Sequence, residues 1–205
     1  FPPAAADLRT RWCSSYLKID VCSAGIVNQP RFRNSRTLVL SGERGEESSR
    51  RAKYAIWEAD KSDCRTGKLH RHVDRHRPIR DWKEAQVWAI IRRYRVRVHT
   101  CYYMGWGRCS CRFCIFGNKN QFASAAVISP ERLHEIATLE KQFGCTIKRK
   151  CDIMTLVDSG TPYRHIPEAL KTIATSYNYE LPVILPDNEE WILPSGAFGG
   201  QCGPM

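Results

Sequence analysis

The chain contains 205 residues with a formal net charge of +11 at pH 7, and 10 of its residues are cysteine. This length suits one domain with a sizeable core. The basic excess indicates an anionic partner (a nucleotide, a sulfate group or nucleic acid), although a solvated basic surface would also explain it. No apolar run is long enough to span a membrane, and the first residues lack the pattern of a secretory signal. We therefore expect no membrane partner, a cytoplasmic location and reduced thiols rather than a disulfide framework.

Residues 7–22 are predicted to form a helix that begins at Asp7 as its cap. Its apolar residues recur every three or four positions and are expected to form one buried face: Leu8, Trp12, Tyr16 and Ile19. Lys18 and two arginines add positive charge around Cys13, whose thiol could equally be a small buried hydrophobic group.

Residues 37–41 (TLVLS) are predicted to be a buried parallel strand that passes directly into a glycine-containing turn. Gly42 and Gly45 allow a tight turn, and residues 47–49 could cap a helix that carries Ala52, Ala55, Ile56 and Ala59. A strand, a turn and a helix N-terminus in this order gather backbone N–H groups for an anion. Three arginines support an anion site here: Arg44, Arg50 and Arg51. Many such units nevertheless bind nothing.

Residues 60–80 are interpreted as a polar, basic connection whose three histidines (His70, His72 and His76) are exposed rather than metal ligands. A helix is then predicted to start at Asp81, with Glu84 three residues later, and to end in a basic run. Its expected inward residues are Ala85, Trp88, Ile91 and Tyr94.

The most unusual stretch of the chain is His99–Asn118 (HTCYYMGWGRCSCRFCIFGN), which combines cysteines, glycines, aromatic residues and Arg108. A helix is predicted from Pro130 to Gly144, carrying Leu133, Ile136, Ala137 and Phe143 inward. A short amphipathic segment at 151–160 and a helix from Pro167 to about Tyr177 follow. We expect an α/β domain over residues 1–180 and an irregular tail over residues 181–205.

The pair Cys111-x-x-Cys114 is compatible with three kinds of site. A redox dithiol requires a helix start that lowers one thiol pKa, and a structural zinc site requires a second pair with similar spacing. An iron–sulfur cluster can use the pair together with distant cysteines that the fold brings in. The spacing alone leaves all three open, with the cluster making the fewest demands on local sequence.

Four segments in order carry a family resemblance: RWCSSYLK, SGERGEESSRRAK, RPIRDWKEAQVW and HTCYYMGWGRCSCRFCIFGNKNQFAS. Together they resemble the phosphoadenosine phosphosulfate (PAPS) reductase family, a branch of the PP-loop ATP pyrophosphatases, and in particular its phage and bacterial members that end in GAFG…GP. The resemblance implies an α/β fold of the adenine-nucleotide α-hydrolase type, with a parallel sheet flanked by helices. The family's PP-loop (Ser-Gly-Gly-x-Asp-Ser) would precede Phe1, so we expect a fragment that is incomplete at the N-terminus, or else a protein that has lost nucleotide chemistry.

The resemblance also implies roles for particular residues. The residues implied to bind the nucleotide or its sulfate are Gly42, Arg44, Glu47, Ser48, Arg51, Tyr102, Gly105 and Arg108, to which we add Lys18. The implied ligands of a 4Fe-4S cluster are Cys13, Cys111 and Cys114, and the candidates for a fourth ligand are Cys109, Cys145 and Cys151. Cys202 is a candidate sulfur nucleophile, although the Glu-Cys-Gly-x-His motif of thioredoxin-dependent reductases is incomplete in this tail.

The leading hypothesis is an enzyme of sulfur metabolism that reduces an adenylylated sulfate to sulfite, with a thioredoxin-like reductant as a partner. The first alternative is an ATP pyrophosphatase that adenylates a substrate for sulfur transfer, as in DNA phosphorothioation, for which the basic charge would suit nucleic acid. The second is a nucleotide-binding module without turnover. Zinc, or no metal, remains the alternative to the cluster.

Overall fold

A computed structural model describes residues 12–149, 151–164 and 166–199. The described residues form two compact units, which we call the N-terminal unit (up to Val87) and the C-terminal unit (from Trp88). The division falls inside one helix, α3 (Glu84–Arg93). Each unit is described by itself below.

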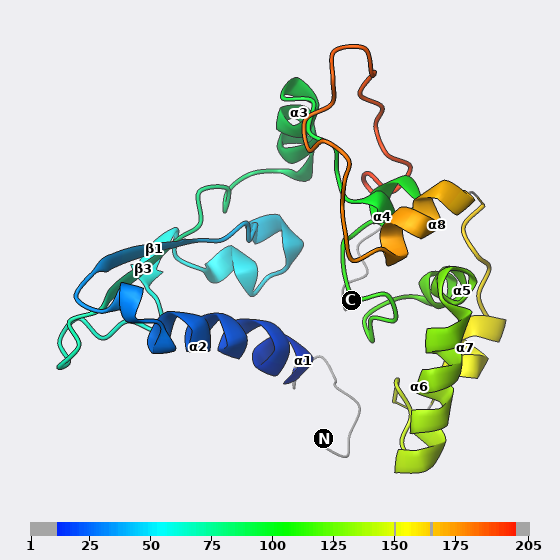
Figure 1. Cartoon of the computed structure of the whole chain (residues 1–205), viewed down its shortest axis with the longest axis horizontal. Helices are drawn as coiled ribbons and strands as arrows, with labels where there is room; N and C mark the ends of the chain where they lie inside the picture. Colours follow the sequence, from blue (N-terminus) through cyan, green and yellow to red (C-terminus); the bar gives the residue numbers. More distant parts are fainter. Residues whose placement is uncertain (1–11, 150, 165, 200–205) are drawn as a thin grey trace. The chain divides into compact units, whose positions relative to one another are not determined.

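The N-terminal unit begins with one long helical segment (Figure 1). A short α1 (Trp12–Ser14) continues through a π turn (Ser15–Ile19) into α2 (Asp20–Asn28), and a 3-10 turn follows at Pro30–Phe32. The predicted helix is confirmed over its described part and is longer than expected, while residues 7–11 lie outside the described residues. The predicted buried face is wrong, because Tyr16 is 63% exposed and Ile19 is 48% exposed. A π turn has a different angular spacing from an α-helix, so three-to-four spacing no longer defines a face there.

The sheet of this unit has three strands in the order β1-β3-β2. Strand β1 (Arg36–Leu40) is parallel to β3 (His72–His76), and β2 (Trp57–Ala59) is antiparallel to β3. The predicted parallel strand is therefore confirmed, but the sheet is mixed rather than parallel. The prediction that this strand is buried is wrong: Leu38 is 48% exposed and Leu40 is 65% exposed. Alternate residues of β1 are covered, as expected of an edge strand with one covered face.

Two predictions about residues 42–80 are wrong, because β2 and β3 lie there. The turn after β1 leads into β2 rather than into a helix, and the supposed basic connection contains the central strand of the sheet. Strand β3 was not recognised in the sequence because most of its residues are charged or polar. The partners that neutralise its charged side chains lie outside the strand. Asp74 pairs with Arg65 at 2.5 Å, and Arg75 pairs with Asp60, whose side chain is only 1% exposed. Val73 is fully buried and is the one apolar residue of β3.

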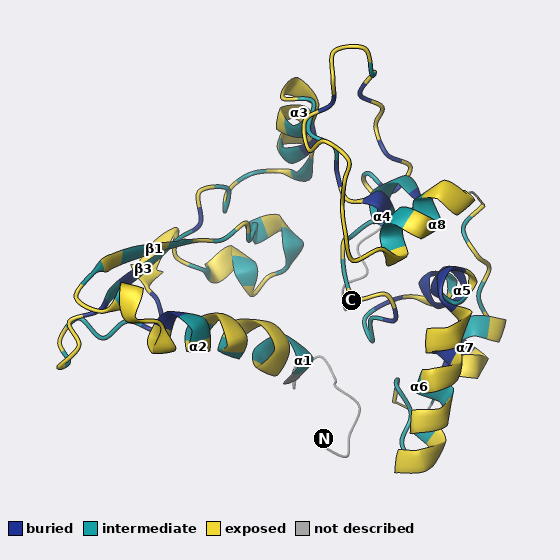
Figure 2. Cartoon of the chain, viewed as in Figure 1, coloured by how far each residue is buried: buried dark blue, intermediate teal, exposed yellow. Residues whose placement is uncertain are grey.

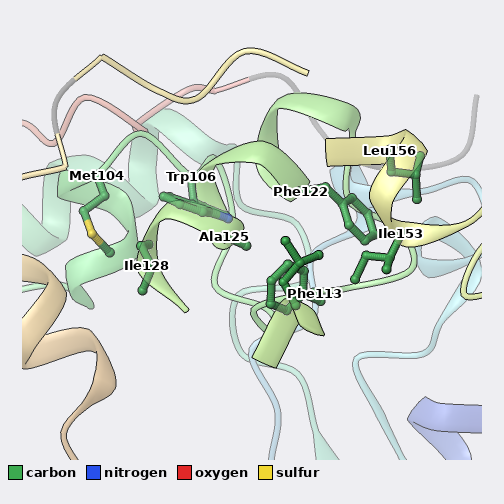
Figure 3. Close-up of a cluster of buried hydrophobic side chains, with 9 residues drawn as sticks. Met104, Trp106, Phe113, Phe122, Ala125, Ile128, Ile153 and Leu156 are labelled. Atoms are coloured by element: carbon green, nitrogen blue, oxygen red, sulfur yellow. The ribbon is translucent and has the colours of Figure 1, made fainter. Parts of the chain in front are cut away.

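The core of the C-terminal unit is built around α5 (Lys119–Ile128), which packs against α6 (Pro130–Phe143) and α7 (Ile153–Asp158). Figure 2 shows α5 as almost wholly buried and α6 as mostly exposed. Figure 3 shows Phe122 of α5 beside Ile153 and Leu156 of α7. Helix α5 was not predicted from the sequence. Its signal was the capping box, in which Asn118 accepts from the Gln121 N–H at 2.9 Å and the Gln121 side chain accepts from the Asn118 N–H.

The other predicted helices are confirmed with altered boundaries or burial. Helix α3 begins at Glu84 rather than beside Asp81: the Asp81 carboxylate pairs with Arg80, and the Glu84 N–H donates to the Glu46 carboxylate at 2.7 Å. Trp88 is buried as predicted, but Ala85 is exposed and Tyr94 is 58% exposed. Helix α6 ends at Gly144 as predicted, with φ of 61°, and Phe143 at its end is 58% exposed rather than inward. Helix α8 (Glu168–Thr175) follows Pro167 as predicted.

A second buried cluster joins α3 to the C-terminal segment of the same unit. It consists of Trp88, Val98, Leu185 and Trp191. The Trp191 indole N–H donates to the Val96 carbonyl at 3.0 Å, and Val96 forms an isolated bridge with Ile184. The proposed division at residue 180 stays a prediction. None of the helices in the described part of the chain is long and apolar enough to cross a membrane.

Candidate functional site

The turn after β1 lies in the N-terminal unit and has a defined backbone. Its start is tied to β3 by the Ser41 N–H, which donates to the His76 carbonyl at 3.1 Å, and the Gly45 N–H donates to the Arg80 carbonyl at 2.7 Å. A Cβ on Gly45 would lie 3.3 Å from the Ala52 Cα and 3.3 Å from the Arg80 carbonyl oxygen, so other backbone segments approach this glycine closely. Among the described residues, the backbone N–H groups of Gly42 and Glu43 donate no hydrogen bond.

The predicted helix N-terminus at this turn is wrong. Two 3-10 turns, Gly45–Glu47 and Arg51–Lys53, stand in its place. Each is too short to provide the aligned dipoles of an α-helix, so any attraction for an anion must come from side chains and individual N–H groups.

Two arginines of the turn, Arg44 and Arg51, are paired with glutamates of the same unit. Arg44 contacts Glu46 at 2.8 Å, and Arg51 pairs with Glu47. The Arg51 N–H also donates to the Ser48 hydroxyl oxygen at 3.2 Å. The Arg44 side chain is 11% exposed, whereas that of Arg51 is 38% exposed, so Arg51 is the more accessible of the two predicted anion ligands.

Arg77 organises this turn, a role that was not predicted from the sequence. Its side chain is 6% exposed and contacts both Glu43 and Glu58 at 2.7 Å. It also donates to the Ala55 carbonyl at 2.8 Å. Burial opposes ionisation of Glu43, but the hydrogen bond and charge of Arg77 lower the pKa of this carboxyl below its ordinary value overall. In the sequence, the one indication of a role for Arg77 was its position at the start of the segment RPIRDW.

A small pocket of about 190 Å³ lies beside the turn. Its lining residues are Gly45, Glu46, Ala52, Arg80, Asp81, Trp82 and Lys83. The Nε atom of Arg80 is buried and has no hydrogen-bond partner among the described residues. This volume is below the range of about 300–1,000 Å³ that is typical of sites for whole small molecules, so the pocket suits one group of a larger ligand.

Two other predicted residues of this unit lie on the first helical segment. Lys18 is exposed in the π turn, and Cys13 is half-buried in α1. Their roles as nucleotide and cluster ligands stay predictions.

In the C-terminal unit, the predicted nucleotide residues of the cysteine stretch have structural contacts of their own. The Tyr102 hydroxyl accepts from the Cys109 N–H at 3.2 Å. Gly105 has φ of 98°, and a Cβ there would lie 3.3 Å from the Tyr163 ring, so this position requires glycine for the fold itself. The Arg108 guanidinium lies 3.8 Å from the Cys114 Sγ. Whether these residues also contact a nucleotide stays a prediction.

The donor set of the C-x-x-C pair fits an anionic iron–sulfur group. Cys111 is exposed, Cys114 is half-buried, and the Arg108 guanidinium beside Cys114 would stabilise a thiolate. Cys145 and Cys151 are half-buried free thiols, and Cys151 packs against the α5 core. Cys202 lies outside the described residues. The complete ligand set therefore remains a prediction.

A second cysteine group was missed in the sequence. The ligand atoms of His99, Cys101 and Cys109 all lie within 4.8 Å of one another. His99 caps the short helix α4 (Thr100–Tyr103), where its Nδ1 accepts from the Cys101 N–H at 3.2 Å. The Cys109 side chain hydrogen-bonds Cys101, and this bond together with burial raises the pKa of the Cys101 thiol above its ordinary value. The spacing His-x-Cys was the available signal, but Cys109 joins it only through the fold.

Part of the sequence is similar to a known protein family, and the fold is consistent with that family. The mixed sheet flanked by helices and the turn at the end of β1 are those of an α/β protein, consistent with the PP-loop fold. The family model of the phosphoadenosine phosphosulfate reductase domain matches residues 17–116. Residues 17–116 are therefore similar to this nucleotide-binding family, and the family prediction is confirmed for that stretch.

One curated relative is described as an "Uncharacterized 37.8 kDa protein in gpa 5'region" of Escherichia phage 186. The two are 28% identical over 141 residues, which is 69% of this chain and 40% of the relative. The chain therefore spans less than half the length of this relative. No solved structure matches the chain.

Proposed function

We propose that this protein binds an adenylylated sulfate nucleotide and reduces it to sulfite. The observation that carries the proposal is the extent of the family match. Residues 17–116 include both the turn that follows β1 and the complete Cys111-x-x-Cys114 pair. The first segment offers groups suited to an anion, and the second offers the thiols that sulfur chemistry requires.

In the proposed role of the turn, the anionic end of the nucleotide approaches the N–H groups of Gly42 and Glu43 and the guanidinium of Arg51. Arg51 already pairs with Glu47, so a phosphate or sulfate would compete with that carboxylate or share the guanidinium with it. Arg77 would act indirectly, by holding Glu43 and the backbone of Ala55 in place.

In the proposed reaction, a cysteine thiolate attacks the sulfur of the adenylylated sulfate, and the bond from this sulfur to the phosphate oxygen breaks. The adenosine phosphate leaves, and a thioredoxin-like dithiol then supplies the two electrons that release sulfite from the cysteine and becomes a disulfide. Cys202 is the proposed nucleophile. The C-x-x-C pair would supply two thiolate ligands to an iron–sulfur group, which when bound would add a redox-active centre to the protein. We propose a reducing, cytoplasmic setting, in keeping with the free thiols of the described cysteines.

Nucleotide binding by the turn is tested by titrating PAPS into the full-length protein in a calorimeter. We expect Arg51→Gln to weaken binding about tenfold, because a charge-assisted hydrogen bond contributes about 1.4 kcal/mol or more. Lys53→Gln, an exposed basic residue two positions away, is the matched control and should bind as the wild type does. Equal affinities for the wild type and Arg51→Gln would remove the turn from the nucleotide site.

A further inference from the structure

Three metal-binding side chains converge at the start of α4 in the C-terminal unit. They are His99, Cys101 and Cys109, and every pair of their ligand atoms is within 4.8 Å. In a tetrahedral zinc site, with Zn–S of about 2.3 Å and Zn–N of about 2.0–2.1 Å, ligand atoms lie about 3.3–3.8 Å apart. The three side chains therefore need to close by only about 1 Å, which side-chain rotation can provide.

The backbone that carries these ligands is already held in place. The Trp106 N–H donates to the Cys101 carbonyl at 3.0 Å, and the Cys109 N–H donates to the Tyr102 hydroxyl at 3.2 Å. These two bonds fold residues 101–109 back on themselves. Little conformational entropy would be lost when a metal joined the ends of this segment.

The site is accessible from one side and supported on the other. His99 and Cys109 are exposed, whereas Cys101 is half-buried and packs against the core cluster of Met104 and Trp106. An ion could reach the exposed ligands from solvent, and the core would restrain the third ligand.

We propose that His99, Cys101 and Cys109 bind one zinc ion with a fourth, exchangeable position. Two thiolates and one neutral imidazole are a known zinc ligand set, and three protein ligands leave room for a water molecule. Two thiolates also balance the charge of Zn²⁺, so the occupied site is neutral within a strongly basic chain. Binding releases the two thiol protons, and it requires the lone pair of His99 Nδ1, or a change of tautomer that frees Nε2.

A zinc ion at this position would link the start of α4 to the residue that directly follows Arg108. It would thereby restrain the segment that leads into Cys111 and Cys114. This site uses neither Cys111 nor Cys114. It does use Cys109, so Cys145 and Cys151 would remain as candidates for the fourth ligand of a cluster. The zinc site is independent of the proposed reductase function.

The test is the metal content of the full chain purified under anaerobic, reducing conditions. We expect about one zinc per chain in the wild type. His99→Ala, Cys101→Ser and Cys109→Ser should each lose most of it. Cys145→Ser, which removes another half-buried thiol of the same unit, is the matched control and should keep its zinc.

Because Cys101→Ser could disturb the core, a second measurement uses the wild type alone. Titration with Co²⁺ should produce the strong visible bands of a tetrahedral site together with thiolate-to-cobalt charge transfer. Three outcomes would overturn the proposal: a wild type without zinc or these bands, a Cys101–Cys109 disulfide in the reduced preparation, or zinc that is lost in Cys111→Ser and kept in Cys109→Ser.

Discussion

At the scale of single residues, the turn after β1 depends on a buried arginine more than on its glycines. Arg77 connects Glu43, Glu58 and the backbone of Ala55, and its side chain is nearly inaccessible. Removing one member of a buried ionic network leaves the other members without compensation, which costs more than the pair contributes while it is intact.

We therefore expect Arg77→Ala to lower the free energy of unfolding by about 2–3 kcal/mol, a value reduced from that of a fully buried pair because both glutamates are partly exposed. The measurement is a urea denaturation curve. Arg132→Ala removes an exposed arginine that pairs with Glu135 and should cost only about 0–1 kcal/mol. Equal losses in the two variants would mean that the network around Arg77 is not a special source of stability.

At the scale of elements, the C-terminal segment packs against the segment that carries the cysteines through two glycine contacts. A Cβ on Gly196 would lie 2.1 Å from the Trp106 carbonyl oxygen, and one on Gly107 would lie 2.6 Å from the Gly199 carbonyl oxygen. The Gly196 N–H also donates to the Tyr102 carbonyl at 2.8 Å. The backbone of the GAFG segment (residues 196–199) therefore packs directly against the backbone of the turn between Tyr102 and Arg108, with no side chain between them.

Gly196→Ala should lower the free energy of unfolding by about 1–3 kcal/mol, because backbone atoms must move to admit the methyl group. Thermal denaturation followed by circular dichroism measures the change. Gly25→Ala is the contrasting variant. Gly25 lies inside α2, and a Cβ there would have only the Gln29 side chain nearby, at 4.0 Å, so the same substitution should stabilise the protein by about 0.5–1 kcal/mol. A Gly196→Ala protein as stable as the wild type would contradict this close packing.

Helices could be predicted from the sequence where the spacing of apolar residues and the capping residues agree. Helix α6 has Pro130 at its start and Gly144 at its end, and both boundaries follow from the chemistry of those two residues. Strand β3 could not be predicted, because its charged residues have partners such as Asp60 and Arg65 that only the fold brings near. Helix α5 has no polar face to create a period, since it is buried on most sides.

The candidate sites also differ in how much of each could be predicted from the sequence. The turn at Gly42 could be located from its glycines and arginines, but the glutamate partners that neutralise those arginines required the structure. The C-x-x-C pair was visible in the sequence. The grouping of His99, Cys101 and Cys109 depends on how residues 101–109 turn, which spacing alone does not determine.

At the scale of the whole molecule, the family match extends from the π turn before α2 to the cysteine stretch and includes residues of both compact units. Each unit contains its own set of chemically distinct groups: the N-terminal unit has paired arginines and glutamates beside the N–H groups of Gly42 and Glu43, and the C-terminal unit has thiols with an adjacent arginine. The net charge of +11 favours anionic ligands for the whole chain but does not distinguish a nucleotide from nucleic acid.

The most direct test of the account is a product assay on the full-length protein under anaerobic conditions. With PAPS and a thioredoxin-type dithiol reductant, we predict that sulfite and adenosine 3′,5′-bisphosphate appear in equal amounts. Cys202→Ser should abolish sulfite release if this residue is the nucleophile. Pyrophosphate from ATP, with no sulfite from PAPS, would contradict the proposed reduction and support adenylation for sulfur transfer instead.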